Sequence, residues 1–234
     1  MKKLSLCGVF LTFALVLGGC PTGSPSTPAS GNLGEDKALD LKGDVYTVEW
    51  EGSASNPTKV TYTKAATAFD GTVTSNLGGT GEIKNGKLTF KIDPPAALTN
   101  DLTNAVVNAI PVNNGNDLSD YYSNVKVTPV TAKYATLSLS VGSKSLDYEK
   151  VGISSSDTSY MYQEEGISYL CLSADVTVTG DKKEPWTSSN LNMTLKKGWN
   201  IIYSKFVYKV SNGETTYSFT MKDEQHSLRW VVDD

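Results

Sequence analysis

The chain has 234 residues and a formal net charge of −4, and this length suits one larger β domain or two small ones. Every basic residue except Arg229 is a lysine, and no basic cluster occurs, which argues against binding to nucleic acid and against attraction to an anionic membrane surface. His226 is the only histidine, and no nucleotide-binding or nucleophile motif occurs, so the composition predicts no metal site, cofactor or catalytic residue.

The first 19 residues have the pattern of an export signal. Lys2 and Lys3 form a positively charged start, and residues 4–17 are almost wholly apolar. This apolar run is shorter than the roughly 20 residues that a membrane-spanning helix needs. We therefore expect residues 1–19 to be a signal peptide that is removed on export.

The signal ends in Leu17-Gly18-Gly19-Cys20, which resembles the lipobox of bacterial lipoproteins. The resemblance implies that Leu17, Gly18 and Gly19 are recognised by the type II signal peptidase. It also implies that Cys20 carries the lipid and that palmitate is one of its acyl chains. Two or three acyl chains on one residue give stable membrane anchoring. An ordinary secretory signal with a chance cysteine is the alternative. Because Pro21 rather than aspartate follows Cys20, the resemblance favours the outer membrane or the cell surface.

Residues 20–36 are expected to form a flexible tether after the lipidated cysteine. The run from Pro21 to Asp36 is rich in Pro, Ser, Thr and Gly and nearly devoid of apolar side chains, so it cannot bury enough surface to fold. Residues 37–234 are expected to form the β-rich domain, and the alternative is two β units divided near residues 113–124.

Alternation of apolar and polar residues with period two predicts β-strands from Asp44 onward. Three hairpins follow from turn chemistry. Their expected turns and central pairs are Asn85-Gly86 with Ile83 opposite Leu88, Asn212-Gly213 with Tyr208 opposite Tyr217, and Lys196-Lys197-Gly198 with Leu195 opposite Trp199.

The predicted fold class is mainly β, an antiparallel meander that forms a sandwich or barrel with one short helix. The meander is expected to include at least four strands between Asn190 and Val232. The helix is expected over Pro94 to Ala109, with Asp93 as its cap and Pro94 at its first position.

Two groups of aromatic residues are candidates for binding. Tyr121 and Tyr122 close the polar loop that begins at Val112, whose Asn and Asp side chains offer oxygen ligands, although it lacks the EF-hand spacing for calcium. Tyr160, Tyr162 and Trp186 are the aromatic residues least committed to a core. Rings of this kind suit stacking on sugars, whereas an ordinary polar loop and ordinary strand tyrosines are the alternatives.

The remaining reactive side chains are expected to be structural. Cys171 is the only cysteine of the folded part, so no disulfide forms within it, and it shares a strand face with Tyr169 opposite Leu170. His226 is expected to be partly buried in a strand. Glu164 and Glu165 are neighbours in sequence and point to opposite faces of a strand, so they make no catalytic pair.

Three segments resemble uncharacterised spirochaete-type lipoproteins. They are NGKLTFKIDPP (Asn85 to Pro95), NLNMTLKKGWN (Asn190 to Asn200) and SLRWVV (Ser227 to Val232). This group has no assigned activity, so the resemblance implies a location and no mechanism.

The sequence therefore predicts a lipid-anchored protein of the bacterial envelope that acts as a non-catalytic binding, adhesion or interaction module. Its expected partners are the membrane, through the anchor, and a carbohydrate or protein ligand. The alternatives are a carbohydrate-active hydrolase of the envelope and a lipocalin-like carrier of a hydrophobic ligand.

Overall fold

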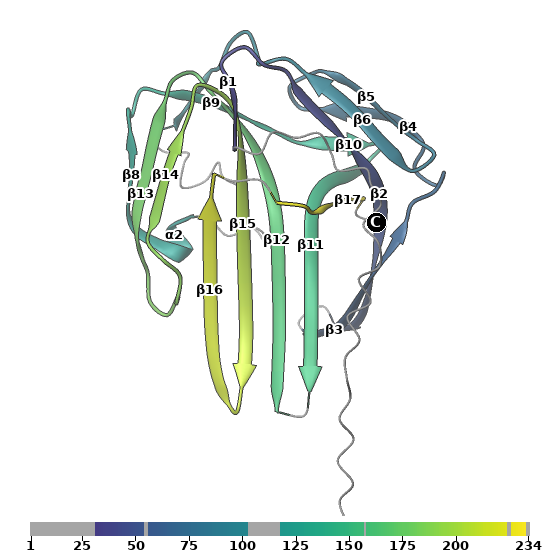
Figure 1. Ribbon diagram of the computed structural model, residues 1–234, viewed down its shortest axis with the longest axis vertical. Coiled ribbons are helices and arrows are strands. Elements are labelled where there is room, and N and C mark those ends of the chain that lie inside the picture. Colours follow the sequence, from purple (N-terminus) through teal and green to yellow (C-terminus); the bar gives the residue numbers. More distant parts are fainter. Residues whose placement is uncertain (1–30, 54–55, 103–117, 157, 224–225, 233–234) are drawn as a thin grey trace, which may run out of the picture.

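The computed structural model describes residues 31–53, 56–102, 118–156, 158–223 and 226–232, which fold mainly as β-strands (Figure 1). The strands of the first half are β1 (Asn32–Gly34), β2 (Leu39–Ser53), β3 (Asn56–Lys64), β4 (Gly71–Ser75), β5 (Thr80–Lys84), β6 (Lys87–Ile92) and β7 (Asn100–Asp101). A short helix, α2 (Leu118–Tyr121), precedes the strands β8 (Tyr122–Thr128), β9 (Lys133–Leu137), β10 (Leu139–Val141), β11 (Lys144–Ser156), β12 (Ser159–Leu172), β13 (Val176–Lys182), β14 (Leu191–Leu195), β15 (Gly198–Ser211), β16 (Glu214–Lys222) and β17 (Arg229–Val232). The prediction of a mainly β, largely antiparallel fold is confirmed.

Seven strands pair in a closed ring in the order β11, β10, β4, β5, β6, β2 and β17, with β17 returning to β11. All of these pairings are antiparallel except that of β17 with β2. The ring encloses a packed apolar core, to which Leu41, Ile83, Phe90 and Trp230 contribute side chains. Burial of these side chains is the main stabilising term for this half of the molecule.

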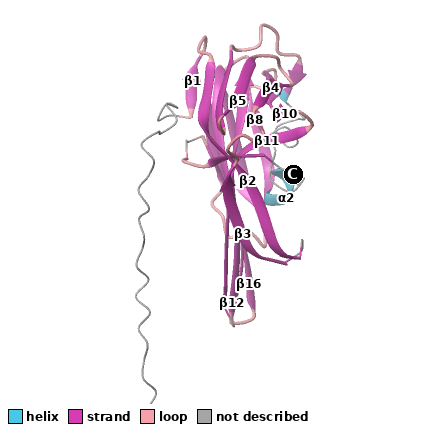
Figure 2. Ribbon diagram, turned by 90° about the vertical axis from the view of Figure 1, so that its right-hand side faces the viewer, coloured by secondary structure: helices cyan, strands magenta, loops and turns pink. Residues whose placement is uncertain are grey.

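The other half of the molecule is built on four long strands in the order β11, β12, β15 and β16. At one end of these strands a separate sheet of β14, β13 and β8 packs against them and encloses a second apolar core. At the other end the four strands project beyond that sheet, as the edge-on view shows for β12 and β16 (Figures 1 and 2).

Strand β12 explains how one strand serves both cores. Tyr169 and Cys171 point into the core of the ring, whereas Leu170 and Leu172 point into the second core. The predicted opposite placement of Cys171 and Leu170 is therefore confirmed, and both faces are buried at this end of the strand. Burial raises the pKa of the Cys171 thiol to about 11, which keeps it protonated and unreactive at neutral pH.

Two of the three predicted hairpins are confirmed with their registers. Ile83 lies opposite Leu88 around Asn85-Gly86, and Tyr208 lies opposite Tyr217 around Asn212-Gly213. All four turn residues have positive φ angles, between 51° and 81°, as a type I′ turn requires.

The third predicted hairpin is wrong, and the four strands between Asn190 and Val232, although present as predicted, do not form one meander. Strand β14 pairs with β13, whereas β15 pairs with β12 along its whole length, and Lys196-Lys197 cross from one sheet to the other. Asp175 holds this crossing through the backbone N–H of Lys197, at 3.0 Å. The predicted register assumed that β15 buries only one face. Trp199 and Ile202 point into different cores, so both faces of this central strand are buried.

The predicted helix over Pro94 to Ala109 is also wrong over residues 94–101, whereas Leu102 is helical. Residues 94–99 form no helix, and Asn100–Asp101 pairs with β9 as strand β7. Because Pro95 follows Pro94, the α conformation is disfavoured at the position where the helix was expected to begin. Residues 103–109 of the expected helix, and residues 113–117 at the expected domain division, lie outside the described residues.

The folded part begins earlier than Lys37. Asn32–Gly34, within the predicted tether, pairs with β15, and Leu33 is buried in the core of the ring. Strand β1 fits here because Gly198 leaves room for it: a Cβ added at Gly198 would lie 2.5 Å from the carbonyl oxygen of Gly34.

Gly198→Ala is expected to lower the free energy of unfolding by at least about 2 kcal/mol, because it adds a backbone clash to the cost of a positive φ. Gly213→Ala is the matched control, since Gly213 also has a positive φ but nothing lies within 4 Å of an added Cβ. Urea unfolding of both variants measures the difference, and equal losses of stability would contradict the close packing of β1 on β15.

Candidate functional site

The projecting ends of the long strands carry a cluster of six rings on one face, here called the aromatic face. Five come from three neighbouring strands, and the sixth comes from the loop between β13 and β14. They are Tyr160 and Tyr162 on β12, Phe206 and Tyr208 on β15, Tyr217 on β16, and Trp186 in the loop.

Strand register brings the five strand rings together. Tyr162 lies opposite Tyr208, and Tyr208 lies opposite Tyr217, so three tyrosines form one row across three strands. Because directly paired residues of neighbouring strands point to the same face, the row lies on one side of the sheet. Phe206 stands two residues from Tyr208 along β15 and therefore shares this face.

Five ring contacts link the six rings in one open series. Ring centroids are 6.0 Å apart for Tyr160 and Tyr208, 5.4 Å for Tyr208 and Tyr217, and 5.5 Å for Tyr217 and Trp186. Phe206 extends the series, because its ring lies 6.0 Å from that of Trp186 and 6.2 Å from that of Tyr162. These tilted and edge-on contacts stabilise the rings in fixed positions.

The aromatic face continues the second apolar core beyond the sheet that covers it. Phe219, opposite Phe206, is fully buried in that core, whereas all six rings of the aromatic face keep part of their surface exposed. Ring surface is thus available to a ligand on a rigid, already packed support.

Trp186 is fixed at the edge of the aromatic face by backbone contacts. Its indole N–H donates a hydrogen bond to the carbonyl oxygen of Asp120, at 2.9 Å. The next residue, Thr187, donates its backbone N–H to the carbonyl oxygen of Tyr217, also at 2.9 Å. The loop therefore follows the edge of β16 and places the indole beside the tyrosine row.

The antiparallel pair β2 and β3, here called the ribbon, borders the aromatic face on the side of β11, away from Trp186. The Tyr160 hydroxyl donates to the carbonyl oxygen of Pro57, at 2.9 Å, and the Tyr62 hydroxyl accepts a hydrogen bond from the backbone N–H of Val151, at 2.6 Å. Trp50 shares the ribbon face of Tyr62, because Trp50 pairs with Val60 and Val48 pairs with Tyr62. The Trp50 side chain is 46% exposed.

The hydroxyls of Tyr62 and Tyr162 stay protonated at neutral pH. Burial raises the pKa of Tyr62 to about 12, and burial together with the neighbouring Glu164 carboxylate raises the pKa of Tyr162 further. The Tyr162 hydroxyl donates to Glu164, at 2.9 Å. On the aromatic face, the Tyr162 phenol and the almost fully buried Glu164 carboxylate therefore form a hydrogen-bonded pair.

Glu164 and Glu165 point to opposite faces of β12, as predicted. Glu164 accepts the hydrogen bond of Tyr162 on the aromatic face, whereas Glu165 accepts one from Tyr203, at 2.7 Å, on the other face. The sheet between them prevents these two carboxylates from acting on one bond.

Tyr121 and Tyr122, predicted as binding residues, belong instead to the second core. Their exposed fractions are 2% and 3%, and Tyr121 stacks on Phe219 with ring centroids 4.0 Å apart. Burial removes both rings from contact with a ligand, so the expectation that they offer free ring faces is wrong. Helix α2 turns Tyr121 inward, and Tyr122 begins β8 with its side chain in the core.

Of the other predicted site residues, three lie together in the structure and four lie outside the described residues. Tyr160, Tyr162 and Trp186 lie together on the aromatic face, whereas Leu17, Gly18, Gly19 and Cys20 lie outside the described residues. Sequence reasoning missed Tyr208, Tyr217 and Phe206, although the register of the Asn212-Gly213 hairpin had already placed them on one face.

His226 precedes β17 instead of lying within a strand. Its ring stacks on that of Tyr203, with centroids 3.5 Å apart. Within the described ranges, no three His, Cys, Asp or Glu side chains are grouped closely enough to hold a metal ion. None of the described helices is long and apolar enough to cross a membrane.

Comparisons with protein-family models, with curated proteins and with solved structures found no match to this chain. Its function therefore has to be argued from the aromatic face and from the sequence.

Proposed function

We propose that this protein is a lipid-anchored protein of the bacterial envelope that binds carbohydrate, without catalysis, on its aromatic face. The observation that carries the proposal is the connected series of six partly exposed rings on the projecting end of the sheet. Ring faces on a rigid support stack on the C–H surfaces of sugars at little entropic cost.

The polar groups of the aromatic face favour sugar over an apolar ligand. The hydroxyls of Tyr160 and Tyr162, which donate to Pro57 and Glu164, can accept from sugar hydroxyls, and the Tyr208 hydroxyl can donate and accept. The row Tyr162, Tyr208 and Tyr217 crosses three strands, and neighbouring strands lie roughly 5 Å apart. We infer that a linear, neutral glycan lies along this row, with Trp186 at one end.

The alternatives receive less support. A carrier of the lipocalin kind needs a cavity inside the ring of strands, but buried side chains such as Leu41, Ile83 and Phe90 pack together there. A hydrolase needs two carboxyl groups that converge on one bond. Glu164 and Glu165 lie on opposite faces of the sheet.

Tryptophan fluorescence tests the binding site. The mature chain from residue 20, with Cys20→Ser, is titrated with neutral hexasaccharides of glucose, galactose and N-acetylglucosamine. Trp186 is partly exposed on the aromatic face, whereas Trp199 and Trp230 are buried and report little. At least one hexasaccharide is expected to shift the emission, and Trp186→Phe is expected to remove most of that shift.

Trp50→Phe is the control, since it removes an exposed indole that is not one of the six rings of the aromatic face. It is expected to keep the Trp186 signal. A full emission change in Trp186→Phe, or no change with any hexasaccharide, would argue against the aromatic face as a carbohydrate site.

The proposed anchor is tested separately by palmitate labelling in a bacterial host. The intact chain is expected to incorporate label and to sediment with membranes, because acyl chains on Cys20 give stable anchoring. Cys20→Ser is expected to abolish both, while Cys171→Ser, which alters a buried thiol, leaves labelling unchanged. Labelling that survives Cys20→Ser would refute the anchor and leave the carbohydrate site untouched.

A further inference from the structure

The opposite face of the projecting sheet has a different chemistry and is here called the lysine face. Strand register places Lys150, Glu165, Lys205 and Thr220 in one row across β11, β12, β15 and β16. Two residues further along the strands, a row of Gly152, Gln163, Val207 and Ser218 follows, and then a row of Ser154, Met161, Lys209 and Thr216. Lysines and hydroxyls thus replace the rings of the aromatic face.

Charge is distributed unequally between the two faces. The described part of these four projecting ends carries Lys150, Lys205, Lys209 and Lys222 on the lysine face, against the carboxylates Glu165 and Glu214. Over the same length of these strands, the side of the aromatic face carries the carboxylates Glu149 and Glu164 and no lysine among its described residues. The net charge of −4 argued against attraction to an anionic membrane, but strand pairing gathers an excess of positive charge on one face.

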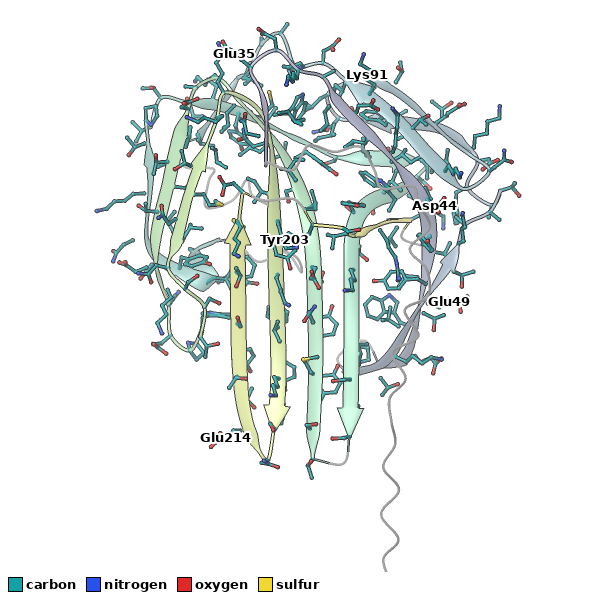
Figure 3. The ribbon with its side chains drawn as sticks, viewed as in Figure 1. Glu35, Asp44, Glu49, Lys91, Tyr203 and Glu214 are labelled. Atoms are coloured by element: carbon teal, nitrogen blue, oxygen red, sulfur yellow. The ribbon has the colours of Figure 1, made fainter. Side chains whose placement is uncertain are left out.

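The lysine face has cationic groups that remain available. The Glu165 carboxylate accepts a hydrogen bond from the Tyr203 hydroxyl, and its Oε1 lies 3.8 Å from Nζ of Lys150. This carboxylate therefore interacts with groups of the protein itself. Lys205 and Lys209 make no ion pair with any described residue. Lys209 also borders a shallow hollow of about 360 Å³ that Ser211, Asn212, Glu214 and Thr216 complete at the tip of the sheet. Figure 3 labels Tyr203 midway along the sheet and Glu214 at that tip.

The chain enters the fold beside the lysine face. The carbonyl oxygen of Gly31 accepts a hydrogen bond from the backbone N–H of Ile201, and Gly31 packs against the backbone of Asp223. The next row of the sheet holds Tyr203 and Lys222, at the border of the lysine face. Ten residues separate Cys20 from Gly31, and they span at most about 35 Å when fully extended.

We propose that the lysine face docks on the anionic phospholipid headgroups of the membrane that holds the anchor. This inference rests on the proposed anchor at Cys20, which brings the membrane within reach of Gly31. Lysines near an anionic bilayer add electrostatic attraction to that of the acyl chains. Because the aromatic face lies on the other side of the same sheet, docking directs it away from the membrane and toward its ligand.

Vesicle sedimentation tests the docking surface without the lipid. The mature chain from residue 20 with Cys20→Ser keeps every described residue and is mixed with vesicles of phosphatidylcholine alone or with phosphatidylglycerol added. Binding is expected only to the anionic vesicles, and it should weaken steeply between 50 and 300 mM salt. The double variant Lys205→Glu/Lys209→Glu is expected to bind at least about tenfold more weakly.

Lys84→Glu/Lys87→Glu is the matched control, because it changes the net charge equally at two exposed lysines of the β5–β6 hairpin. It is expected to bind anionic vesicles like the parent chain. Equal losses in the two double variants, or no binding of the parent chain to anionic vesicles, would overturn the proposal. Inorganic phosphate that competes with vesicles at micromolar concentration would also overturn it, since that result indicates a discrete anion site. None of these outcomes alters the fluorescence test of the aromatic face or the labelling test of Cys20.

Discussion

Phe219→Ala is expected to lower the free energy of unfolding by about 3–5 kcal/mol, which is typical for a fully buried phenylalanine. The Phe219 side chain is 1% exposed and stacks on Tyr121, and its ring lies 6.0 Å from that of Tyr122. Removing it leaves a cavity beneath the aromatic face, since the surrounding strands are fixed by their ladders and relax only in part.

Urea unfolding of the wild type and Phe219→Ala measures this loss. Phe69→Ala is the control, because Phe69 is only partly buried and packs at the margin of the other core. It is expected to cost less than about 1.5 kcal/mol. Similar losses in the two variants would contradict the assignment of Phe219 to the centre of the second core.

Tyr208→Ala is expected to weaken carbohydrate binding at least about tenfold. Tyr208 is the central ring of the row, between Tyr162 and Tyr217, and it also contacts Tyr160. Loss of this ring removes stacking and buried area worth at least about 1.4 kcal/mol, which corresponds to a tenfold change in affinity. Tyr208→Phe keeps the ring and is expected to stay within about threefold of the wild type.

Isothermal titration calorimetry with the best-binding hexasaccharide measures both variants, and thermal unfolding checks that each is folded. Tyr134→Ala serves as the control, since Tyr134 pairs with Leu172 at the far end of β12. Its affinity is expected to match that of the wild type. Unchanged binding by Tyr208→Ala, or an equal loss in Tyr134→Ala, would contradict stacking on the tyrosine row.

Local patterns predicted the local structure well. The turns at Asn85-Gly86 and Asn212-Gly213 require positive φ at both positions, and this requirement alone determined the registers of two hairpins. Alternation likewise predicted that Cys171 and Leu170 point to opposite sides. These features depend on residues close in sequence, where turn chemistry and side-chain direction are decisive.

Pairings between distant segments could not be predicted in the same way. Strand β17 pairs in parallel with β2, and β12 pairs with β15, through contacts that no turn specifies. The third hairpin failed for this reason, because the partner of β14 is β13 and the partner of β15 is β12. Compatibility with two cores at once, and not the Lys196-Lys197-Gly198 turn, determines these pairings.

The candidate site contains some residues that local sequence patterns identified and others that only distant strand pairing brings to it. Tyr160, Tyr162 and Trp186 were identified from sequence as aromatic residues without an evident core role, and the structure brings them together. Tyr121 and Tyr122 were assigned to the same purpose but are buried, since helix α2 and the start of β8 direct them inward. Tyr208 and Tyr217 join the site only through the long-range pairing of β15 with β12.

The central claim is that carbohydrate binds on the aromatic face, and one glycan-array measurement tests it most directly. The mature chain with Cys20→Ser and the same chain carrying Tyr162→Ala/Tyr208→Ala are applied to one array of neutral and charged glycans. The proposal predicts that the parent chain binds a group of neutral linear glycans and that the variant, although folded, does not. Failure of the parent chain to bind any glycan, or equal binding by the variant, would contradict it.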